Sequence, residues 1–343
     1  MNFAEEKGDM DMSYIVKTQQ EADVLTSVLP GAWGTVGPKF EEAGDVIARW
    51  MQVGYGLMVF SPSAALETIL RSFNIGYGDE VIVAAWSDPV DSMVSAAVGA
   101  VPVFADLCPK TMTLSVNKAA AAVTERSRAI VADLPGGNPC DAKALRALCD
   151  EKGLKLILNL SDGWSAKQDG MALVKYADAA FVDVSQGKAV DLGLAAAVVT
   201  DNVENHKLVY AYHNCGRPWG VVESTLSFDE ILGGDLRVAE WQASLIPGRL
   251  GKSAEVDALC KVRAAAAVAA LPEGAGIPVI SGGEAAGRGV LAKASGEEVY
   301  PAMHLQPFFK DPYFVKLTGC SLAWKEGDFP VSEAAAATVR LVK

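Results

Sequence analysis

The apolar positions between about residues 40 and 200 follow two alternating periods. Short apolar runs, which are typical of buried strands, occur at YGLMVFS, DEVIVAAW, VPVFADL, RAIVADL, LKLILNL, AAFVDVS and LAAAVVTD. Between several of these runs lie stretches with helical spacing, such as SAALETILRSF, DSMVSAAVGA and DAKALRALCDEKG. Strands that alternate with helices predict an α/β fold of three layers, in which a mostly parallel sheet carries helices on both faces.

The pattern also predicts how the chain is divided. Residues 1–30 are expected to form an acidic leader and a short helix, and residues 31–240 to form the large domain. Residues 241–343 have a different pattern of apolar positions, and they predict a smaller C-terminal α/β domain. Its expected elements are a helix at AEVDALCKVRAAAAVAAL, a glycine-rich loop, strands at GVLAKAS and SLAWK, and a closing helix at FPVSEAAAATVRLV.

Charge and cysteine content narrow the classes of function. The formal net charge is −12, from 30 basic and 42 acidic residues, so the chain has no general attraction to nucleic acid or to an anionic membrane. The six cysteines form no Cys-x-x-Cys pair, and no zinc-binding spacing is present. Reduced thiols and an N-terminus without an apolar signal segment predict a cytoplasmic protein with small-molecule or protein partners.

Several familiar catalytic motifs are missing from the sequence. There is no Gly-x-Gly-x-x-Gly after a strand, no phosphate-binding Walker loop and no Gly-x-Ser-x-Gly nucleophile turn. The three histidines have no evident serine or cysteine partner, so hydrolase chemistry lacks support.

Candidate chemistry lies instead where the predicted strands end. Ser61-Pro62-Ser63, Trp86, Asn159, Asp162 and Lys188 each follow an apolar run. Ligands of open α/β sheets bind at the carboxyl ends of the strands, so these side chains together predict a site. Each also has an ordinary interpretation: a helix N-cap followed by proline, a tryptophan packed at the rim, or a lysine on a surface loop.

The order of several segments resembles a known family. SAALETILRSFNIGYGDEVIVAAW, PGGNPCDAKALRALCDEKGLKLIL, GGDLRVAEWQA and FPVSEAAAATVRL are similar, in register, to the DegT-type (DegT/DnrJ/StrS) sugar aminotransferases. The resemblance covers roughly residues 30 to 335. These are pyridoxal-phosphate enzymes of fold type I, so the resemblance implies that fold, that cofactor and a homodimer with its site at the interface. It also implies amino transfer to a keto-sugar nucleotide.

The resemblance assigns roles to the strand-end residues. Lys188 matches the family's Schiff-base lysine, which reacts as a free amine, and Trp86 matches the aromatic residue that stacks on the cofactor ring. Asn159 stands where the family has a carboxylate against the pyridine nitrogen, and a neutral amide cannot stabilise a pyridinium by charge. Asp162 stands where the family has glutamine.

The phosphate-binding positions differ more strongly. The family's Gly-Thr turn is Pro62-Ser63 here, and proline removes one backbone N–H donor. Asp183 replaces the family's serine, and Asp235 replaces an asparagine that the neighbouring subunit contributes. A like-charge contact at ~4 Å costs on the order of 4 kcal/mol at an effective dielectric constant near 20, so two carboxylates oppose a bound phosphate. A shifted alignment would place Ser185 at the serine position, but it would also shift Lys188.

Two hypotheses follow for the function. In the first, the protein is a working aminotransferase, and Lys188 is buried and faces Trp86 across a cavity. In the second, the fold and the dimer persist in a binding or regulatory relative that does not use pyridoxal phosphate. The second hypothesis predicts a collapsed cleft, or a salt bridge from Lys188 to Asp162 or Asp183.

Overall fold

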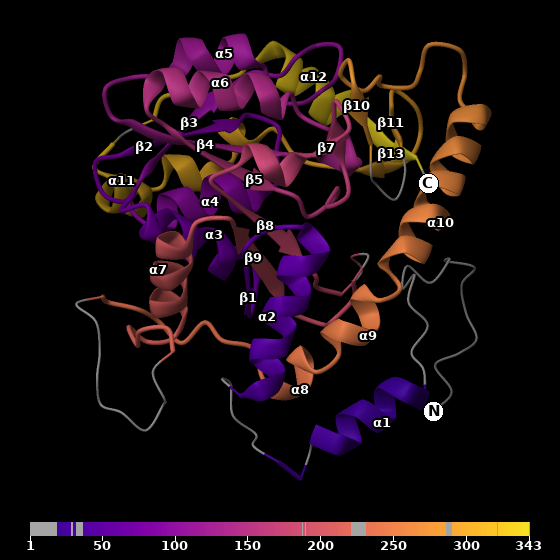
Figure 1. Ribbon diagram of the computed structural model, residues 1–343. Helices are drawn as coiled ribbons and strands as arrows, with labels where there is room; N and C mark the ends of the chain where they lie inside the picture. Colours follow the sequence, from indigo (N-terminus) through magenta and orange to yellow (C-terminus); the bar gives the residue numbers. More distant parts are fainter. Residues whose placement is uncertain are drawn as a thin grey trace, which may run out of the picture.

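A seven-stranded sheet forms the centre of the molecule (Figure 1). The computed structural model describes residues 19–28, 30–31, 37–186, 188, 190–220, 231–285, 290–320 and 322–342. The strand order is β1-β9-β8-β5-β4-β2-β3, and β9 is antiparallel to both of its neighbours. The strands span Tyr55–Val59 (β1), Glu80–Ala84 (β2), Val101–Ala105 (β3), Ser127–Asp133 (β4), Lys155–Asn159 (β5), Ala179–Asp183 (β8) and Ala196–Thr200 (β9). The predicted mostly parallel sheet is therefore confirmed.

Helices cover both faces of this sheet, as the sequence predicts. Figure 1 shows α5 and α6 on one side and α3, α4 and α7 on the other, and α3 packs against both α4 and α7. Several of these helices begin after a residue whose side chain caps the first turn. The Ser61 hydroxyl accepts from Ala64 N before α3, and the Asp141 carboxylate accepts from Ala144 N before α6. The helices span Pro38–Met51 (α2), Pro62–Ser72 (α3), Pro89–Ala97 (α4), Val116–Ala122 (α5), Ala142–Lys152 (α6) and Val203–His213 (α7).

Most of the remaining elements lie before α2 or after α7. Helix α1 is Gln19–Val28, and the rest of the predicted leader, residues 1–18, lies outside the described residues. A second, antiparallel sheet has the order β11-β13-β12. The later elements span Glu240–Ala243 (α8), Ile246–Leu250 (α9), Ser253–Ala270 (α10), Val290–Ala292 (β11), Glu297–Glu298 (β12), Pro312–Thr318 (α11), Pro330–Thr338 (α12) and Arg340–Val342 (β13). The pair β6 (Lys167–Gln168) and β7 (Met171–Ala172) forms a small sheet with β10 (Gly283–Glu284).

Two sequence predictions for the C-terminal part are wrong. The closing helix ends at Thr338, and Arg340–Val342 forms a strand because it pairs with β11 and β12. Residues 322–325 are irregular rather than a strand. The Trp324 ring lies edge-on to Phe104 with a centroid distance of 4.6 Å, so this segment is fixed by aromatic packing instead of a strand ladder.

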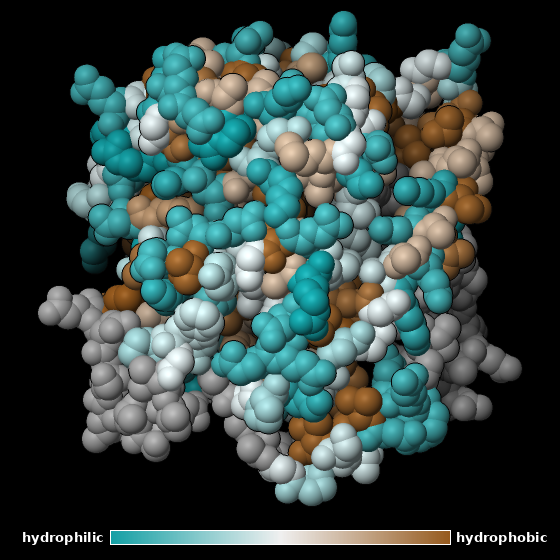
Figure 2. All heavy atoms as spheres, viewed as in Figure 1, coloured by the Kyte–Doolittle hydropathy of each residue, from teal (hydrophilic) through white to brown (hydrophobic). Residues whose placement is uncertain are grey.

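One hydrophobic cluster runs from the central sheet into the C-terminal part. Every residue of β2 is buried, and Met303, Phe309 and Val339 belong to the same cluster of buried side chains. The surface in Figure 2 is largely hydrophilic, with an apolar patch over α10, where Leu259, Val262 and Val268 are exposed. Among the helices that the structure describes, none has both the length and the apolar character that crossing a bilayer requires.

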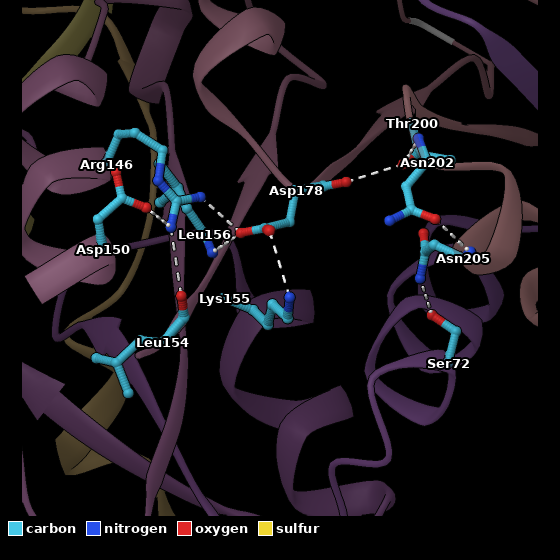
Figure 3. A network of polar contacts seen from close by, with 10 residues as sticks. All are labelled: Ser72, Arg146, Asp150, Leu154, Lys155, Leu156, Asp178, Thr200, Asn202 and Asn205. Carbon is cyan, nitrogen blue, oxygen red and sulfur yellow. Dashed lines mark hydrogen bonds and ion pairs between the residues drawn. The ribbon is translucent and has the colours of Figure 1, made fainter. Parts of the chain in front are cut away.

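A polar network fixes the edge of the sheet at which β5 and β8 begin (Figure 3). The Asp178 carboxylate accepts from Arg146 Nη1 at 2.6 Å and from Leu156 N at 2.8 Å, and its backbone oxygen accepts from the Thr200 hydroxyl at 2.9 Å. The Asn205 amide donates to the Ser72 hydroxyl at 2.6 Å, which joins α7 to α3. This edge is structural, and it leaves the carboxyl ends of the strands as the place for a ligand.

Candidate functional site

The four neighbouring strands β8, β5, β4 and β2 are parallel and end at one edge of the sheet. Lys188 reaches this edge from a turn after β8, in which its backbone N–H donates to Ser185 O at 3.1 Å. Its Nζ lies 2.8 Å from Asp162 Oδ1 and 3.9 Å from Asp183 Oδ2. The Lys188 side chain is 22% exposed, so it is not a surface loop residue. The structure therefore brings Lys188, Asp162 and Asp183 together.

Charge determines the protonation of Lys188. Burial by itself would lower the pKa of Lys188, because it disfavours the charged form. The carboxylates of Asp162, Asp183 and Asp88 outweigh burial and hold the pKa above its ordinary value. Lys188 is therefore an ammonium ion at neutral pH, and an ammonium ion has no lone pair for attack on an aldehyde.

Three further carboxyl groups at this edge were missed by the sequence analysis. Asp88 precedes α4, Asp91 lies in its first turn, and Asp133 ends β4. Asp91 is fully buried; its Oδ1 accepts from Asn159 Nδ2 at 3.0 Å, and its Oδ2 makes no hydrogen bond with a described residue. Asp133 Oδ2 accepts from Asp88 N at 3.2 Å.

These three groups resist ionisation. Burial, together with the repulsion between neighbouring carboxylates, raises the pKa of Asp88 and of Asp91, and raises that of Asp133 to about 8. Among the described residues, no group of three or more histidine, cysteine or carboxylate side chains is arranged to hold a metal ion. The cluster is therefore a set of carboxyl groups near one lysine, three of which have raised pKa values.

Both the nitrogen and the oxygen of the Asn159 amide make hydrogen bonds. Its Nδ2 donates to Asp91, as described above, and its Oδ1 accepts from Ser161 N at 3.2 Å. The side chain is buried, and it also hydrogen-bonds the Asp88 carboxyl. Asn159 consequently orders the loop after β5 and holds Asp91 in place.

Trp86 is covered by a residue from the C-terminal part. The indole is fully buried, and its Nε1 donates to Tyr300 O at 2.7 Å. The two rings meet edge-on with a centroid distance of 5.5 Å, and the Tyr300 hydroxyl lies 3.4 Å from Asp162 Oδ2. Sequence reasoning missed Tyr300 because it lies 214 positions from Trp86 and in no periodic pattern.

The residues of the predicted phosphate turn form the N-terminus of α3. The Ser61 hydroxyl caps Ala64 N, Pro62 is the first residue of α3, and Ser63 is exposed. Asp183 accepts from Ser185 N at 2.8 Å, and the Ser185 hydroxyl donates to Ala195 O at 3.2 Å. The Ser61 hydroxyl thus accepts a hydrogen bond from its own helix, and the Ser185 hydroxyl donates to a backbone oxygen.

Asp235 lies apart from this group in its contacts. It is 59% exposed and accepts from Arg237 Nε at 2.7 Å and from Nη2 at 2.9 Å. Hydrogen bonding to Arg237 lowers the pKa of Asp235, so this carboxylate is ionised. Arg237 braces Asp235 in this arrangement, and the resemblance assigned Asp235 to the site of a neighbouring subunit.

A model of the DegT/DnrJ/EryC1/StrS aminotransferase family matches residues 16–273. The L-glutamine:2-deoxy-scyllo-inosose aminotransferase of Streptomyces paromomycinus is 31% identical over 240 residues, which are 66% of this chain and 56% of that protein. The 3-amino-5-hydroxybenzoate synthase of Amycolatopsis mediterranei is 30% identical over 222 residues, or 64% of this chain and 56% of that protein. The chain thus spans only a little over half the length of these curated relatives.

Solved structures share the fold over nearly the whole chain. The structure of DesV from S. venezuelae with a ketimine intermediate has a TM-score of 0.82 and 23% identity, and the match covers 94% of this chain and 88% of that one. A 3-amino-5-hydroxybenzoic acid synthase has a TM-score of 0.82 and 21% identity, with 94% and 90% covered. The fold class that the sequence predicts is therefore confirmed.

Proposed function

Because this chain belongs to the DegT/DnrJ/EryC1/StrS aminotransferase family, we propose a specific departure within that family. The protein is a relative whose strand-edge cleft no longer accepts pyridoxal phosphate and binds a cationic or neutral small molecule instead. Its role is binding or regulation rather than transamination. The observation that carries this proposal is the ion pair between Lys188 and Asp162 at 2.8 Å.

The lysine does not fit the cofactor in this arrangement. Asp162, which stands where the resembling family has glutamine, contacts the Lys188 nitrogen directly and holds it in an ion pair. The raised pKa of Lys188 also keeps it protonated.

The positions for the ring and the phosphate do not fit either. Asn159 has both ends of its amide engaged, and a neutral amide supplies no counter-charge to a pyridinium. Asp183 occupies the position that the resemblance gives to a phosphate-binding serine, where its charge would repel a dianionic phosphate, and Pro62 removes a backbone donor from the matching turn. The residues present therefore disfavour the cofactor at three separate places.

The same residues suit a ligand that carries a donor group. Asp162 and Asp183 present carboxylate oxygens to Lys188, and a ligand ammonium group would find the same acceptors. A cation or a neutral hydroxyl or amide therefore gains hydrogen bonds where an anion meets repulsion.

The direct test measures cofactor binding. Pyridoxal phosphate is added to the purified protein, the visible spectrum is recorded, and borohydride reduction is followed by peptide mapping. We expect no new band and no adduct on Lys188. A matched variant, D162Q/D183S, removes both carboxylates beside the lysine by restoring the residues of the resembling family, and it is expected to gain a band. A band and an adduct on Lys188 in the unaltered protein would contradict the proposal.

The preference for a cation is tested separately by ligand-induced stabilisation. 1,4-Diaminobutane should raise the thermal midpoint in proportion to its occupancy, and succinate, a diacid of similar length, should not. The double variant D162N/D183N should lose the response to the diamine. A larger response to succinate than to the diamine would show that the cleft is not selective for cations.

A second candidate function is amino transfer to a keto-sugar nucleotide. It is favoured by the presence of Lys188 and Trp86 at one strand edge and by relatives whose names are those of aminotransferases. Its test is amino-group transfer from glutamate or glutamine to a keto-sugar nucleotide in the presence of pyridoxal phosphate, followed by mass spectrometry. An aminated product that is absent with Lys188→Ala would establish this candidate.

The assembly implied by the resemblance is a homodimer with its site at the interface. The exposed Asp235, which Arg237 holds in one orientation, supports this proposal because such a side chain is available to another subunit. Sedimentation equilibrium measures the mass directly. If the protein were a monomer at micromolar concentration, Asp235 could not contribute to the site of another subunit.

A further inference from the structure

A cavity of about 180 Å³ lies beside the edge strand β1, and none of its lining residues belongs to the carboxylate cluster around Lys188. Helices α2 and α7 both pack against β1 (Figure 1), and residues of all three elements line the cavity together with Trp219. Glu41 and Asp45 of α2 are part of the wall, whereas none of the described residues in it is a lysine or an arginine. The described wall is therefore acidic.

Three aromatic side chains that line this cavity also contact one another. The rings of Tyr55 and His206 are stacked, with centroids 5.0 Å apart and planes inclined at 25°. The Trp219 ring stands at 85° to Tyr55 and at 90° to His206, with centroid distances of 6.1 Å and 4.9 Å. Trp219 is 39% exposed and Tyr55 is half-buried, so the protein covers this aromatic surface only in part.

His206 belongs to this group as a neutral ring. Burial lowers the pKa of His206 to about 4, because it disfavours the charged imidazolium. At neutral pH the side chain is therefore an uncharged aromatic ring. It adds apolar surface to the cavity without adding a charge that would repel a cation.

The two acidic residues of the wall have no counter-charge among the described residues. Partial burial, together with the charges of Asp45 and Glu240, raises the pKa of Glu41. Lys39, which lies in the first turn of α2, pairs with Glu42 at 2.8 Å instead. A cation in this cavity would consequently reduce a repulsion that already exists between carboxylates.

We propose that this cavity binds a small organic cation with an alkylated ammonium group, such as a quaternary ammonium. Aromatic rings attract such a cation through their electron-rich faces, and carboxylates at the same cavity add opposite charge. An anion would be repelled there, and a neutral ligand would gain only apolar contact. The volume lies below the roughly 300–1,000 Å³ of sites for drug-sized ligands, which suits a compact head group.

The test compares choline with 3,3-dimethyl-1-butanol, which has nearly the same shape and no charge. Binding to the full chain is followed in ¹⁵N-tryptophan-labelled protein through the indole N–H signal of Trp219, which is assigned by its loss in Trp219→Phe. Sodium chloride keeps the ionic strength constant throughout. Choline is expected to shift this signal in a saturable way, with an affinity at least about tenfold higher than that of the alcohol.

Matched variants assign the effect to the cavity, and calorimetry measures each affinity. Glu41→Gln should weaken choline binding about two- to fivefold, and Trp219→Leu, which removes the aromatic ring, about three- to tenfold. Glu42→Gln, an exposed residue of α2 outside the cavity wall, should leave the affinity unchanged. D162N/D183N, which alters the strand-edge cleft, should also leave it unchanged, so this result is independent of the proposed function.

Three outcomes would overturn the proposal. The first is that choline does not shift the Trp219 signal in a saturable way, or binds no more tightly than the neutral alcohol. The second is that Glu41→Gln and Trp219→Leu, shown by circular dichroism to be folded, bind choline as the unaltered protein does. The third is that Glu42→Gln weakens binding as much as Glu41→Gln, because the general charge of α2 would then account for the effect.

Discussion

The surroundings of single residues decide what the strand-edge cleft can do. Lys188 has one ammonium group, while Asp162, Asp183 and Asp88 all raise its pKa. Burial, together with the repulsion between neighbouring carboxylates, raises the pKa of three carboxyl groups at this edge, those of Asp88, Asp91 and Asp133. The charges at this edge therefore favour the protonated form of Lys188, whereas a nucleophilic amine must be deprotonated.

Removing the carboxylates should make Lys188 reactive. In D162N/D183N the two opposite charges beside the amine are lost, so its pKa should fall toward the lower value that burial favours. At pH 8 an amine-reactive acylating reagent should then modify Lys188 about tenfold faster, as quantified by peptide mass spectrometry. The exposed Lys207 serves as an internal control. Equal rates at Lys188 in both proteins would show that its charge does not depend on these carboxylates.

The buried Asp133 should make stability depend on pH. Its pKa is about 8 in the folded protein and about 4 in an unfolded chain, so between these values only the folded state keeps the proton. The free energy of unfolding should consequently fall as pH rises through this window, by up to roughly 1.4 kcal/mol per pH unit from this group. Asp133→Asn cannot titrate, so denaturant unfolding at pH 5 and pH 8 should show a smaller fall for the variant. An identical change in both proteins would refute the shift.

At the scale of elements, one helix and one strand lie in unusually close contact. A Cβ atom at Gly44 of α2 would stand 2.7 Å from Gly56 O in β1, and a Cβ at Gly56 would stand 2.6 Å from Gly44 O. Both neighbours are backbone atoms, which cannot rotate away as a side chain can. The glycines therefore set the distance between α2 and the edge of the sheet.

An added methyl group at this contact should destabilise the folded protein. Gly44→Ala should lower the free energy of unfolding by about 1–3 kcal/mol, because the helix or the strand must shift. Gly248→Ala in α9 is the matched control, since a Cβ there meets nothing within 4 Å, and alanine in a helix is favoured over glycine by about 0.5–1 kcal/mol. Urea denaturation measures both values. Equal stabilities of the two variants would contradict the close packing.

At the scale of the whole molecule, the C-terminal part is held to the central sheet by polar contacts as well as by its core. Asp106, just after β3, accepts from Val331 N at 3.1 Å and from Ser332 N at 2.8 Å, so it caps α12 from across the fold. Met303 N donates to Ala85 O at 2.8 Å beside Trp86. These contacts place Tyr300 over the strand edge, so Trp86 is covered by a segment distant in sequence.

Removing the distant cap should loosen α12 without unfolding the sheet. Asp106→Ala leaves two backbone N–H groups and the Ser332 hydroxyl without their acceptor, at a cost of about 1–2 kcal/mol. Amide hydrogen exchange should accelerate in α12, while β4 and β5 keep their protection. Asp311→Ala removes the cap of α11 instead, so it should accelerate exchange there. Unchanged exchange in α12 would show that Asp106 does not anchor it.

Part of the candidate site could be predicted from the sequence. Asn159, Asp162 and Lys188 follow apolar strands, and the carboxyl ends of parallel strands meet at one edge. The same rule would have found Asp133 at the end of β4, but Asp91 lies in the first turn of a helix, where a carboxylate is ordinary. A local pattern thus predicts which edge carries the site and only some of its members.

The sequence alone determined the alternation of strands and helices, the family and the lysine at the strand edge, because each depends on residues close together in the chain. Tertiary structure decided the rest. Asp162 meets Lys188 across 26 positions and Tyr300 across 138, and the pKa values of Asp91 and Asp133 depend on burial by elements that the local sequence does not specify. Charge interactions and desolvation depend on distance in space, and only the folded chain fixes those distances.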